Sequence, residues 1–483
     1  MSRMKLAGGV VGALVVVEAT SGVIQGYYTP LLTDIARHLG IHDADINWFE
    51  AAQLLLSAIV VPVLARLGDM FGHRKVLIGS LIATMLASWA IAFAPSFPLF
   101  VLVWALQGFY VVWLPLNVAI IHARSRDRED GAALTRKGAG IIVVALQAGA
   151  IGGALLGGEL GLRLPLWAAL CVPAVMVTIA LAVVIFAVPD TGVRAGGTID
   201  SRGAVVLTLA LLAITGGLSL VRLDGITPWV VGMIAAGAAL LALFVRVERC
   251  AEDPLVDMSL LSRPTVWPVM LTAGLFGVSV LGAQGPLSTF ARTDPDEVGY
   301  GLGLTSATVS YLIGAYVFSL LVGAGLFARV SARYSPRGVL VAASFLVAAG
   351  YLALIPFHGL GFAAVLACMV VAGLGSGALV AALPAAAAAA APAHQTAQAT
   401  GLTNTTKTIG GAFASAAFAI ALATGVAGAA AASGGESTAG SLSGYLTVWA
   451  ICGGTAVVAG IALLTMPKVA FRHNVDVATT LGV

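Results

Sequence analysis

The sequence ARLGDMFGHRKVL at residues 65–77 decides the fold, because it recurs in altered form as ARVSARYSPRGVL at residues 328–340. The two segments lie 263 residues apart and match at five positions, among them Arg74 with Arg337. Each copy is a short basic segment between two long apolar blocks. The repeat predicts two halves of parallel origin, with a central cavity at the interface between them.

The apolar blocks on either side of these segments make up most of the chain. Of its 483 residues 59% are hydrophobic and only 10% are charged, whereas a soluble chain has about 25% charged residues. Blocks of roughly 20 apolar residues match the hydrocarbon core of a bilayer. A helix satisfies its own backbone polar groups in lipid, and the alternation typical of a membrane barrel is absent. The sequence therefore predicts an all-α polytopic protein whose surroundings are a lipid bilayer.

Fourteen such blocks predict fourteen transmembrane helices. They lie near residues 7–29, 47–66, 76–95, 99–121, 138–160, 164–188, 203–221, 229–247, 267–290, 305–328, 339–357, 361–383, 401–425 and 445–466. We expect two six-helix halves at residues 1–190 and 265–483, and an inserted pair, spans 7 and 8 with their linkers, at residues 191–264.

The basic residues orient these spans. An even number of spans puts both termini on one side, and 21 of the 25 Lys and Arg residues fall on that side, Lys407 counted among them. The other side keeps Arg37, Arg163, Arg222 and Arg292. Because Lys and Arg accumulate in cytoplasmic loops, both termini are predicted to be cytoplasmic. The Lys-poor, Ala- and Gly-rich composition indicates a bacterial plasma (inner) membrane.

Residues 65–75 resemble the signature loop of the major facilitator superfamily, Gly-x-Leu-Ala-Asp-x-x-Gly-Arg-Lys. Leu67, Asp69, Gly72, Arg74 and Lys75 are in register, with Ala65 for the first Gly and His73 for the first basic residue. The resemblance implies a major facilitator fold and a conformational latch at Asp69, Gly72, Arg74 and Lys75. A carboxylate and cations at helix ends can hold neighbouring helices until the halves rock. The alternative is an ordinary basic loop.

Span 5 carries a second resemblance. Gly149, Gly153, Gly157 and Gly158 are similar to the antiporter motif Gly-x-x-x-Gly-Pro-x-x-Gly-Gly of drug exporters, with Ala154 in the Pro position. Small residues at this spacing let two helices approach closely, so packing alone is the alternative interpretation.

Two acidic residues within spans are the candidate proton-coupling sites. Glu18 lies in the middle of span 1, and Glu18-x-Thr20 resembles the Asp-x-Thr opening of the fourteen-span drug:proton antiporters. A carboxyl group in a low dielectric favours its protonated form, so it can bind a proton from one side and release it to the other. The alternative is a permanently protonated, hydrogen-bonded Glu18. Glu50, near the outer end of span 2, is a second proton or cation site or an interfacial carboxylate.

Span 4 departs from that family. Trp104-Ala-Leu-Gln107-Gly108 stands where the drug:proton antiporters have Arg-x-x-Gln-Gly. Any proton coupling that the resemblance implies must therefore run on carboxylates alone.

Polar and aromatic residues on facing helices are the candidate substrate contacts. They are Gln25, Tyr28, Gln53, Trp113, Asn117, Gln147, Gln284 and Tyr311. None of them is basic, so the cavity favours a neutral or cationic hydrophobic compound over an anion. Each amide can equally be a hydrogen bond between helices.

These observations predict a secondary active transporter that exports a hydrophobic drug, antibiotic or natural product by proton antiport with alternating access. A lipid or glycolipid translocase of the same fold remains open. The chain has no Gly-x-x-x-x-Gly-Lys-Ser/Thr string, which excludes an ATP-driven pump on this chain. Its scattered His and Cys residues indicate neither an enzyme nor a metal site. We expect protons and the substrate as partners, no cofactor, no nucleic acid, and a monomer.

Overall fold

The computed structural model describes residues 2–125, 131–190, 200–251, 254–391, 396–424 and 439–465. Within these segments the regular secondary structure is helical, and fourteen spans are long and apolar enough to cross a membrane. The prediction of an all-α protein with fourteen transmembrane helices is confirmed.

The first half contains six spans. They are α1 (Ser2–Tyr27) continued by η1 (Thr29–Leu31) and α2 (Leu32–Leu39), η2 (Asp43–Ile46) with α3 (Asn47–Phe71), α4 (His73–Ala92), α5 (Phe97–Gln107) continued by η3 (Gly108–Val112) and α6 (Trp113–Ser125), α7 (Gly131–Arg163), and α8 (Leu166–Ala187).

The inserted pair and the second half supply the other eight spans. They are α9 (Ser201–Asp224), α10 (Pro228–Cys250), α12 (Trp267–Val280) with α13 (Gln284–Arg292), α15 (Ser306–Arg333), α16 (Pro336–Phe357) with η4 (His358–Leu360), α17 (Phe362–Ala390), α18 (Thr396–Ala423) and α20 (Leu442–Thr465). Two short helices, α11 (Met258–Leu261) and α14 (Pro295–Val298), lie in the connections.

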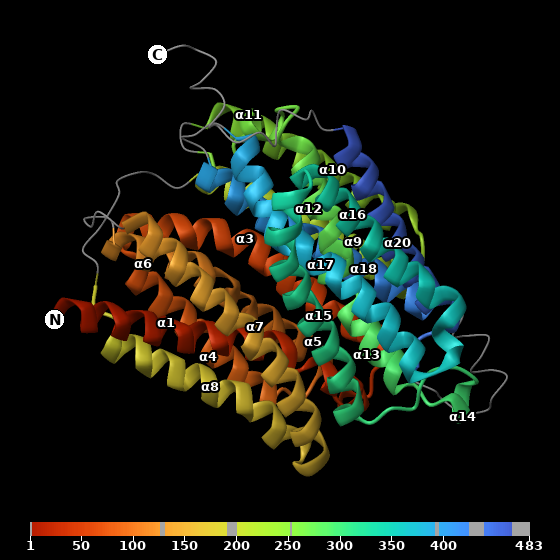
Figure 1. Ribbon diagram of the computed structural model, residues 1–483. Coiled ribbons are helices and arrows are strands. Elements are labelled where there is room, and N and C mark those ends of the chain that lie inside the picture. Colours follow the sequence, from red (N-terminus) through yellow and green to blue (C-terminus); the bar gives the residue numbers. More distant parts are fainter. Residues whose placement is uncertain are drawn as a thin grey trace.

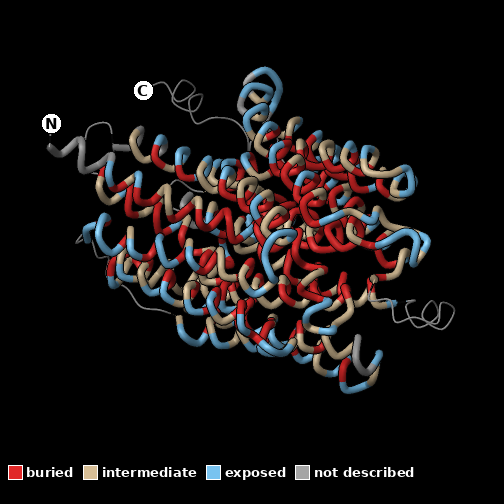
Figure 2. The backbone as a smooth tube through the Cα atoms, turned by 90° about the horizontal axis from the view of Figure 1, so that it is seen from below, coloured by how far each residue is buried: buried red, intermediate tan, exposed pale blue. Residues whose placement is uncertain are grey.

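The helices form two bundles that lie side by side, with α1 to α8 in one and α12 to α20 in the other (Figure 1). Each bundle has its own large cluster of buried apolar side chains, and the buried residues concentrate inside while the exposed ones face outward (Figure 2). In the inserted pair, Leu207 and Leu211 of α9 pack with Leu54 of α3 and Ala412 of α18, so α9 touches both bundles. The predicted boundary after residue 190 precedes residues 191–199, which lie outside the described residues.

The helix ends define two faces of the bundle. The basic face carries the two copies of the repeated segment, with Arg74 and Arg337 at the start of α4 and α16. The α2 face carries α2 and α13 at the opposite ends of the spans. Five basic residues that the sequence assigns to the side of the termini lie outside the described residues: Arg126, Arg128, Arg194, Lys468 and Arg472.

Lys407, which was counted with the basic residues on the side of the termini, lies inside a membrane span, as the expected span at residues 401–425 implies. Lys407 lies within α18, inside the span Ala399–Ala423. The start of this helix is rich in Thr and Asn and therefore resembles a loop. However, Thr403, Thr406 and Thr408 bond carbonyl oxygens of the preceding turn, at Thr400, Leu402 and Asn404, which makes these polar residues compatible with a membrane helix.

Glycine residues let α1 and α7 pack backbone against backbone. A Cβ atom added to Gly149 would lie 2.1 Å from the carbonyl oxygen of Ala19, and one added to Gly157 would lie 2.1 Å from that of Tyr27. From the other side, a Cβ on Gly22 would lie 1.9 Å from Leu146 O. Since real side chains cannot approach that closely, only Gly fits at these positions. The predicted antiporter motif therefore holds α7 against α1.

The second half repeats this contact between α12 and α18. A Cβ on Gly277 would lie 2.0 Å from Lys407 O, and one on Gly410 would lie 2.0 Å from Gly274 O. Each half thus contains a pair of helices that pack backbone against backbone at equivalent positions, and α15 and α17 of the second half form a further pair of this kind.

We predict that Gly157→Ala destabilises the protein, because the added methyl group must displace the α1 backbone. Overpacking of this kind costs about 1–3 kcal/mol. The matched control is Gly152→Ala on the same helix, where an added Cβ meets no atom within 4 Å. Thermal unfolding of purified protein in detergent should show a lower Tm for Gly157→Ala and an unchanged or higher Tm for Gly152→Ala. Equal Tm values for the two variants would contradict the close contact.

Candidate functional site

A cavity of about 570 Å³ lies where the two halves meet, and we call it the central cavity. Four of the predicted substrate residues, Gln25, Tyr28, Gln53 and Gln284, line it, and so does Glu50. The remaining lining residues are Ile24, Thr29, Leu32, Leu54, Trp104, Tyr110 and Leu281. The lining thus comes from the first span, α3, the α5–η3 segment and the break between α12 and α13. The predicted cavity between the halves is present.

Aromatic rings form one wall of the central cavity. The Tyr28 and Trp104 rings lie 4.8 Å apart between centroids, and the Phe49 ring, which does not line the cavity, lies 5.4 Å from the Trp104 ring. Gln107 Nε2 donates a hydrogen bond of 2.9 Å to Tyr28 Oη and fixes that ring. Trp104 occupies the position at which the sequence departs from the antiporter pattern, so an apolar ring takes the place of a cation here.

Sequence reasoning missed Trp104 and Tyr110 as lining residues. Tyr110 reaches the cavity because the helix changes from α5 to the 3-10 helix η3 at Gly108. An added Cβ on Gly108 would lie 2.6 Å from the carbonyl oxygen of Gln53, so the break lets the fourth span approach α3. The only sequence feature that could have indicated this helix break is the Gln107-Gly108 pair.

Glu50 is the acidic side chain of the central cavity. It lies in the first turn of α3 and lines the cavity. No described hydrogen-bond donor or cation pairs with its carboxyl group. An unpaired carboxylate beside three aromatic rings can attract a proton or an organic cation. Of the two interpretations of Glu50, its position favours a site facing the cavity.

Glu18 is fully buried within the first half and does not line the central cavity. Asn117 Nδ2 donates a hydrogen bond of 2.7 Å to Glu18 Oε1, while Glu18 Oε2 and Asn117 Oδ1 have no partner among the described residues. Asn117, predicted to contact substrate, is thus the partner of the buried acid. Thr20 bonds its own helix at Val16 O. A carboxyl group with one unpaired oxygen can accept a proton without losing its amide contact.

Three other predicted substrate residues do not line the central cavity. Trp113 is fully buried inside the first half, and Gln147 is half-buried on α7. Tyr311 is 56% exposed and lies on one face of α15 with exposed Phe318 and Val322. Since the spacings of seven and four residues put these side chains on one helix face, Tyr311 belongs to the surface that faces lipid. A polar aromatic residue in a span does not reveal from sequence which face it occupies.

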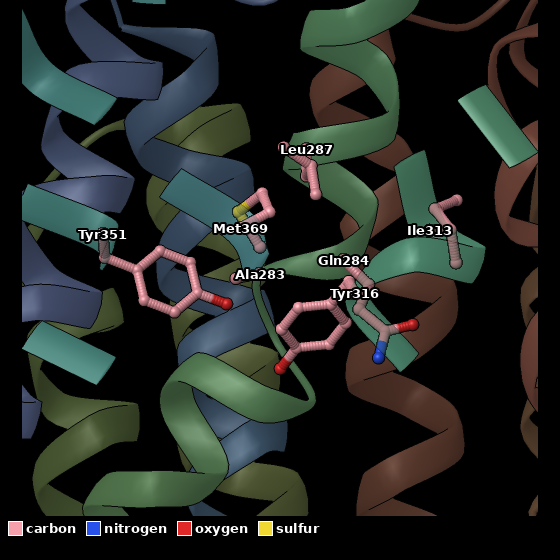
Figure 3. A pocket seen from close by; sticks show the side chains of 7 residues that line it. All are labelled: Ala283, Gln284, Leu287, Ile313, Tyr316, Tyr351 and Met369. Carbon is pink, nitrogen blue, oxygen red and sulfur yellow. The ribbon is translucent and has the colours of Figure 1, made fainter. Parts of the chain in front are cut away.

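A second cavity, of about 240 Å³, lies within the second half (Figure 3). Side chains from the α13 region, α15, α16 and α17 converge on it, and Gln284 borders both cavities. Its two tyrosine hydroxyls are already bonded, Tyr316 to Ser376 Oγ at 3.3 Å and Tyr351 to Ser279 O at 2.8 Å. We interpret this side cavity as a packing gap of the second half.

Polar contacts close the central cavity toward the α2 face. Arg292 of α13 donates to Asp34 of α2 at 2.5 Å, an ion pair between the two halves. Beside it, Ser288 Oγ donates to Thr29 O at 2.6 Å. At the end of α7, Ser306 Oγ donates to the carbonyl oxygen of Gly158, at 3.0 Å. These bonds hold the halves together at one face.

The predicted latch residues lie at the basic face. Gly72 has a φ of +105°, which ends α3 and turns the chain into α4. His73 pairs with Asp69 at 3.1 Å, and Lys75 is exposed. Arg74 donates to Ile185 O at 2.9 Å and to Val188 O, at the end of α8.

The repeat carries the same arginine contact into the second half. Arg337 donates to Leu463 O at 3.1 Å and to Leu464 O, at the end of α20. Each arginine therefore binds the last carbonyls of the last helix in its own half, where a cation is favoured. This supports the repeat that was read from the sequence.

Comparison with known proteins gives the same architecture. The chain is 27% identical over 424 residues to the multidrug efflux pump LfrA of Mycolicibacterium smegmatis, covering 85% of this chain and 81% of that one. It is 26% identical over 442 residues to the puromycin resistance protein pur8 of Streptomyces alboniger, covering 90% and 85%. Among solved structures, the nucleoside transporter NupG matches with a TM-score of 0.67 at 15% identity, covering 95% of this chain and 99% of that one.

The family assignment has independent support. A model of the Major Facilitator Superfamily matches residues 14–415, which is most of the chain. Two similar halves with a cavity between them are the architecture that such a match implies, and this chain has fourteen spans. The chain belongs to the Major Facilitator Superfamily.

Proposed function

We propose that the chain is a secondary transporter that exports hydrophobic neutral or cationic small molecules in exchange for protons. The observation that carries this proposal is the central cavity, in which the carboxyl group of Glu50 lies with three aromatic rings, of Tyr28, Trp104 and Tyr110. The multidrug efflux pump and the puromycin resistance protein among its relatives support export.

The lining of the central cavity suits a lipophilic cation. An aromatic face attracts a cation within about 6 Å of the ring centre, by about 0.5–2 kcal/mol. Glu50 adds an opposite charge, while Gln25, Gln53 and Gln284 offer donors and acceptors that can adapt to different substrates. Neutral aromatic compounds lose only the charge interaction.

The contacts between the halves support alternating access as part of this proposal. The bonds of Asp34 with Arg292 and of Ser288 with Thr29 close the α2 face. Breaking them while the halves rock would expose the central cavity to that face. The proposal puts the basic face in the cytoplasm and the protein in a bacterial plasma membrane, since Lys- and Arg-rich loops stay cytoplasmic. Opening of the α2 face then releases substrate outside the cell. The latch at Asp69, Gly72, Arg74 and Lys75 acts at the cytoplasmic face.

In this proposal two carboxyl groups, of Glu50 and Glu18, couple transport to protons, and each has a different role. Glu50 lines the cavity and binds either substrate or a proton. Glu18 is buried inside the first half, where it accepts a hydrogen bond from Asn117, and it holds a proton at a position that substrate does not reach. Because a charged carboxylate is costly within the membrane, a proton that enters one of these groups changes the stability of each conformation.

We predict that Glu50→Gln and Glu18→Gln have different effects. In proteoliposomes with an imposed pH gradient, Glu50→Gln should lower uptake of tetraphenylphosphonium about tenfold or more, because a charge-assisted contact worth about 1.5–3 kcal/mol is lost. Glu18→Gln should keep substrate exchange without a gradient but lose accumulation driven by the gradient.

The control for removing an acid is Glu159→Gln, since Glu159 pairs with Arg163 on the surface of α7. It should transport like the native chain. If Glu50→Gln and Glu18→Gln both move substrate with unchanged pH dependence, proton antiport through carboxylates is wrong, and uniport or lipid translocation gains support.

We also predict that Arg292→Gln opens the α2 face. The pair with Asp34 is mostly buried, and losing it should cost the closed state about 1–2 kcal/mol. That changes a conformational population by a factor of roughly 5–30. A cysteine introduced by Gln25→Cys in the central cavity reports the opening, through its rate of reaction with a membrane-impermeant maleimide added from the α2 face.

Arg292→Gln should raise this rate, and Arg163→Gln, which removes an ion pair within one helix at the same face, should leave it unchanged. The exchange Asp34→Arg with Arg292→Asp should restore slow labelling. Equal rates in the native and Arg292→Gln proteins would rule out this pair as the closure.

A further inference from the structure

Lys407 is a cation within the membrane for which the proposed mechanism has no use. It lies eleven residues after the start of α18 at Thr396, or about 16 Å along the helix axis. Its side chain is half-buried. A cation at this depth is costly, so intramembrane lysines usually have a partner or a function.

No acid neutralises Lys407 within the described part of the chain. Its ammonium group makes no ion pair, hydrogen bond or ring contact there. Three acidic residues of the spans have partners other than Lys407. Glu18 accepts a hydrogen bond from Asn117, Asp34 forms an ion pair with Arg292, and Glu248 accepts a hydrogen bond from the backbone N–H of Val256. The ammonium group is therefore available to a ligand.

The face of α18 that carries Lys407 turns toward the first half. Gly411 lies one turn further along the same face. A Cβ on Gly411 would lie 3.1 Å from Leu54 of α3 and 2.8 Å from Leu281, and both of these leucines line the central cavity. Lys407 thus lies one turn from the cavity, on the side of the basic face.

The backbone of Lys407 is held in place by the glycine contact between α12 and α18. Its carbonyl oxygen lies where a Cβ on Gly277 would be 2.0 Å away. This packing fixes the depth of the lysine in the membrane, so the ammonium group has a defined position relative to the cavity.

Glu50 and Lys407 bracket the central cavity. Glu50 lies one turn from Leu54 toward the α2 face, and Lys407 lies one turn from Gly411 toward the basic face. Since Leu54 approaches Gly411, the two charged residues are separated by about two helical turns, or about 11 Å along the membrane normal. The acidic and the basic residue therefore lie on opposite sides of the Leu54–Gly411 contact, with Glu50 in the cavity lining and Lys407 one turn beyond it.

We propose that Lys407 binds the acidic group of zwitterionic amphiphiles, whose cationic end binds at Glu50 and the aromatic wall. This inference rests on the proposed function and adds a substrate class to it. Without Lys407 the cavity would disfavour any compound that carries a carboxylate. With Lys407 such a compound is bound through both of its charges, and the separation between them contributes to selectivity.

Two dyes with the same cationic ring system provide the test. Rhodamine 110 carries a free carboxylate, and rhodamine 123 is its methyl ester. We would measure the Kd of each dye by fluorescence polarisation with the purified full-length chain in detergent. The variants are Lys407→Met, Lys407→Arg and, as a control lysine at the basic end of α7, Lys137→Met. Thermal unfolding of each variant would be measured alongside.

The native chain should bind both dyes. Lys407→Met should raise the Kd of rhodamine 110 at least about tenfold, because one charge-assisted contact is lost. It should change the Kd of rhodamine 123 less than about twofold. Lys407→Arg should retain the affinity for both dyes, and Lys137→Met should bind both dyes with the Kd values of the native chain.

The other outcomes separate this inference from the proposed function. Equal losses for both dyes in Lys407→Met would show a structural role for the lysine and overturn the proposal, as would unchanged affinity for rhodamine 110. A native chain that binds rhodamine 123 but not rhodamine 110 contradicts this inference alone. A native chain that binds neither dye contradicts the export of lipophilic cations and this inference with it.

Discussion

The hydrocarbon core of a bilayer offers charges and backbone groups no partners, and this constraint organises the whole protein. Backbone groups are satisfied by helices, so the chain folds as fourteen spans. Ionisable side chains within the spans must turn inward. Glu18 meets Asn117, Glu50 faces the central cavity, and Lys407 lies on the face of α18 that meets the first half. Glu50 and Lys407 therefore lie near the plane where the halves meet, whereas Glu18 is buried inside the first half.

The fold was predictable because it depends on signals that repeat. The number of spans follows from apolar length, and the relation between the halves follows from one repeated loop. Arg74 and Arg337 make the same kind of contact with the end of the last helix in each half. Lys407 was counted on the side of the termini because it lies near the start of the expected span at residues 401–425. Threonine side chains at the polar start of α18 bond carbonyl oxygens of the preceding turn, and a hydropathy pattern does not contain these bonds.

The site was predictable only in part. Gln25, Tyr28, Gln53, Glu50 and Gln284 do meet in one cavity, since polar residues in a span are placed where they avoid lipid. Tyr311 is exposed on α15 and does not line this cavity. A tyrosine also tolerates a position on the lipid side, so its polarity does not fix its face. Trp104 was interpreted only as a departure from the antiporter pattern. Tyr110 was missed because it reaches the cavity from the 3-10 segment that starts at Gly108, where the fourth span meets the backbone of α3.

The interrupted helices that frame the central cavity also affect how it can open. The first span is interrupted at η1 and the ninth at residues 281–283, so α2 and α13 are short helices that follow longer ones. The ion pair of Arg292 with Asp34 joins these two short helices, whereas α1 packs along its backbone against α7. The contact that closes the α2 face therefore belongs to the short helices, and the packing of α1 with α7 does not depend on it.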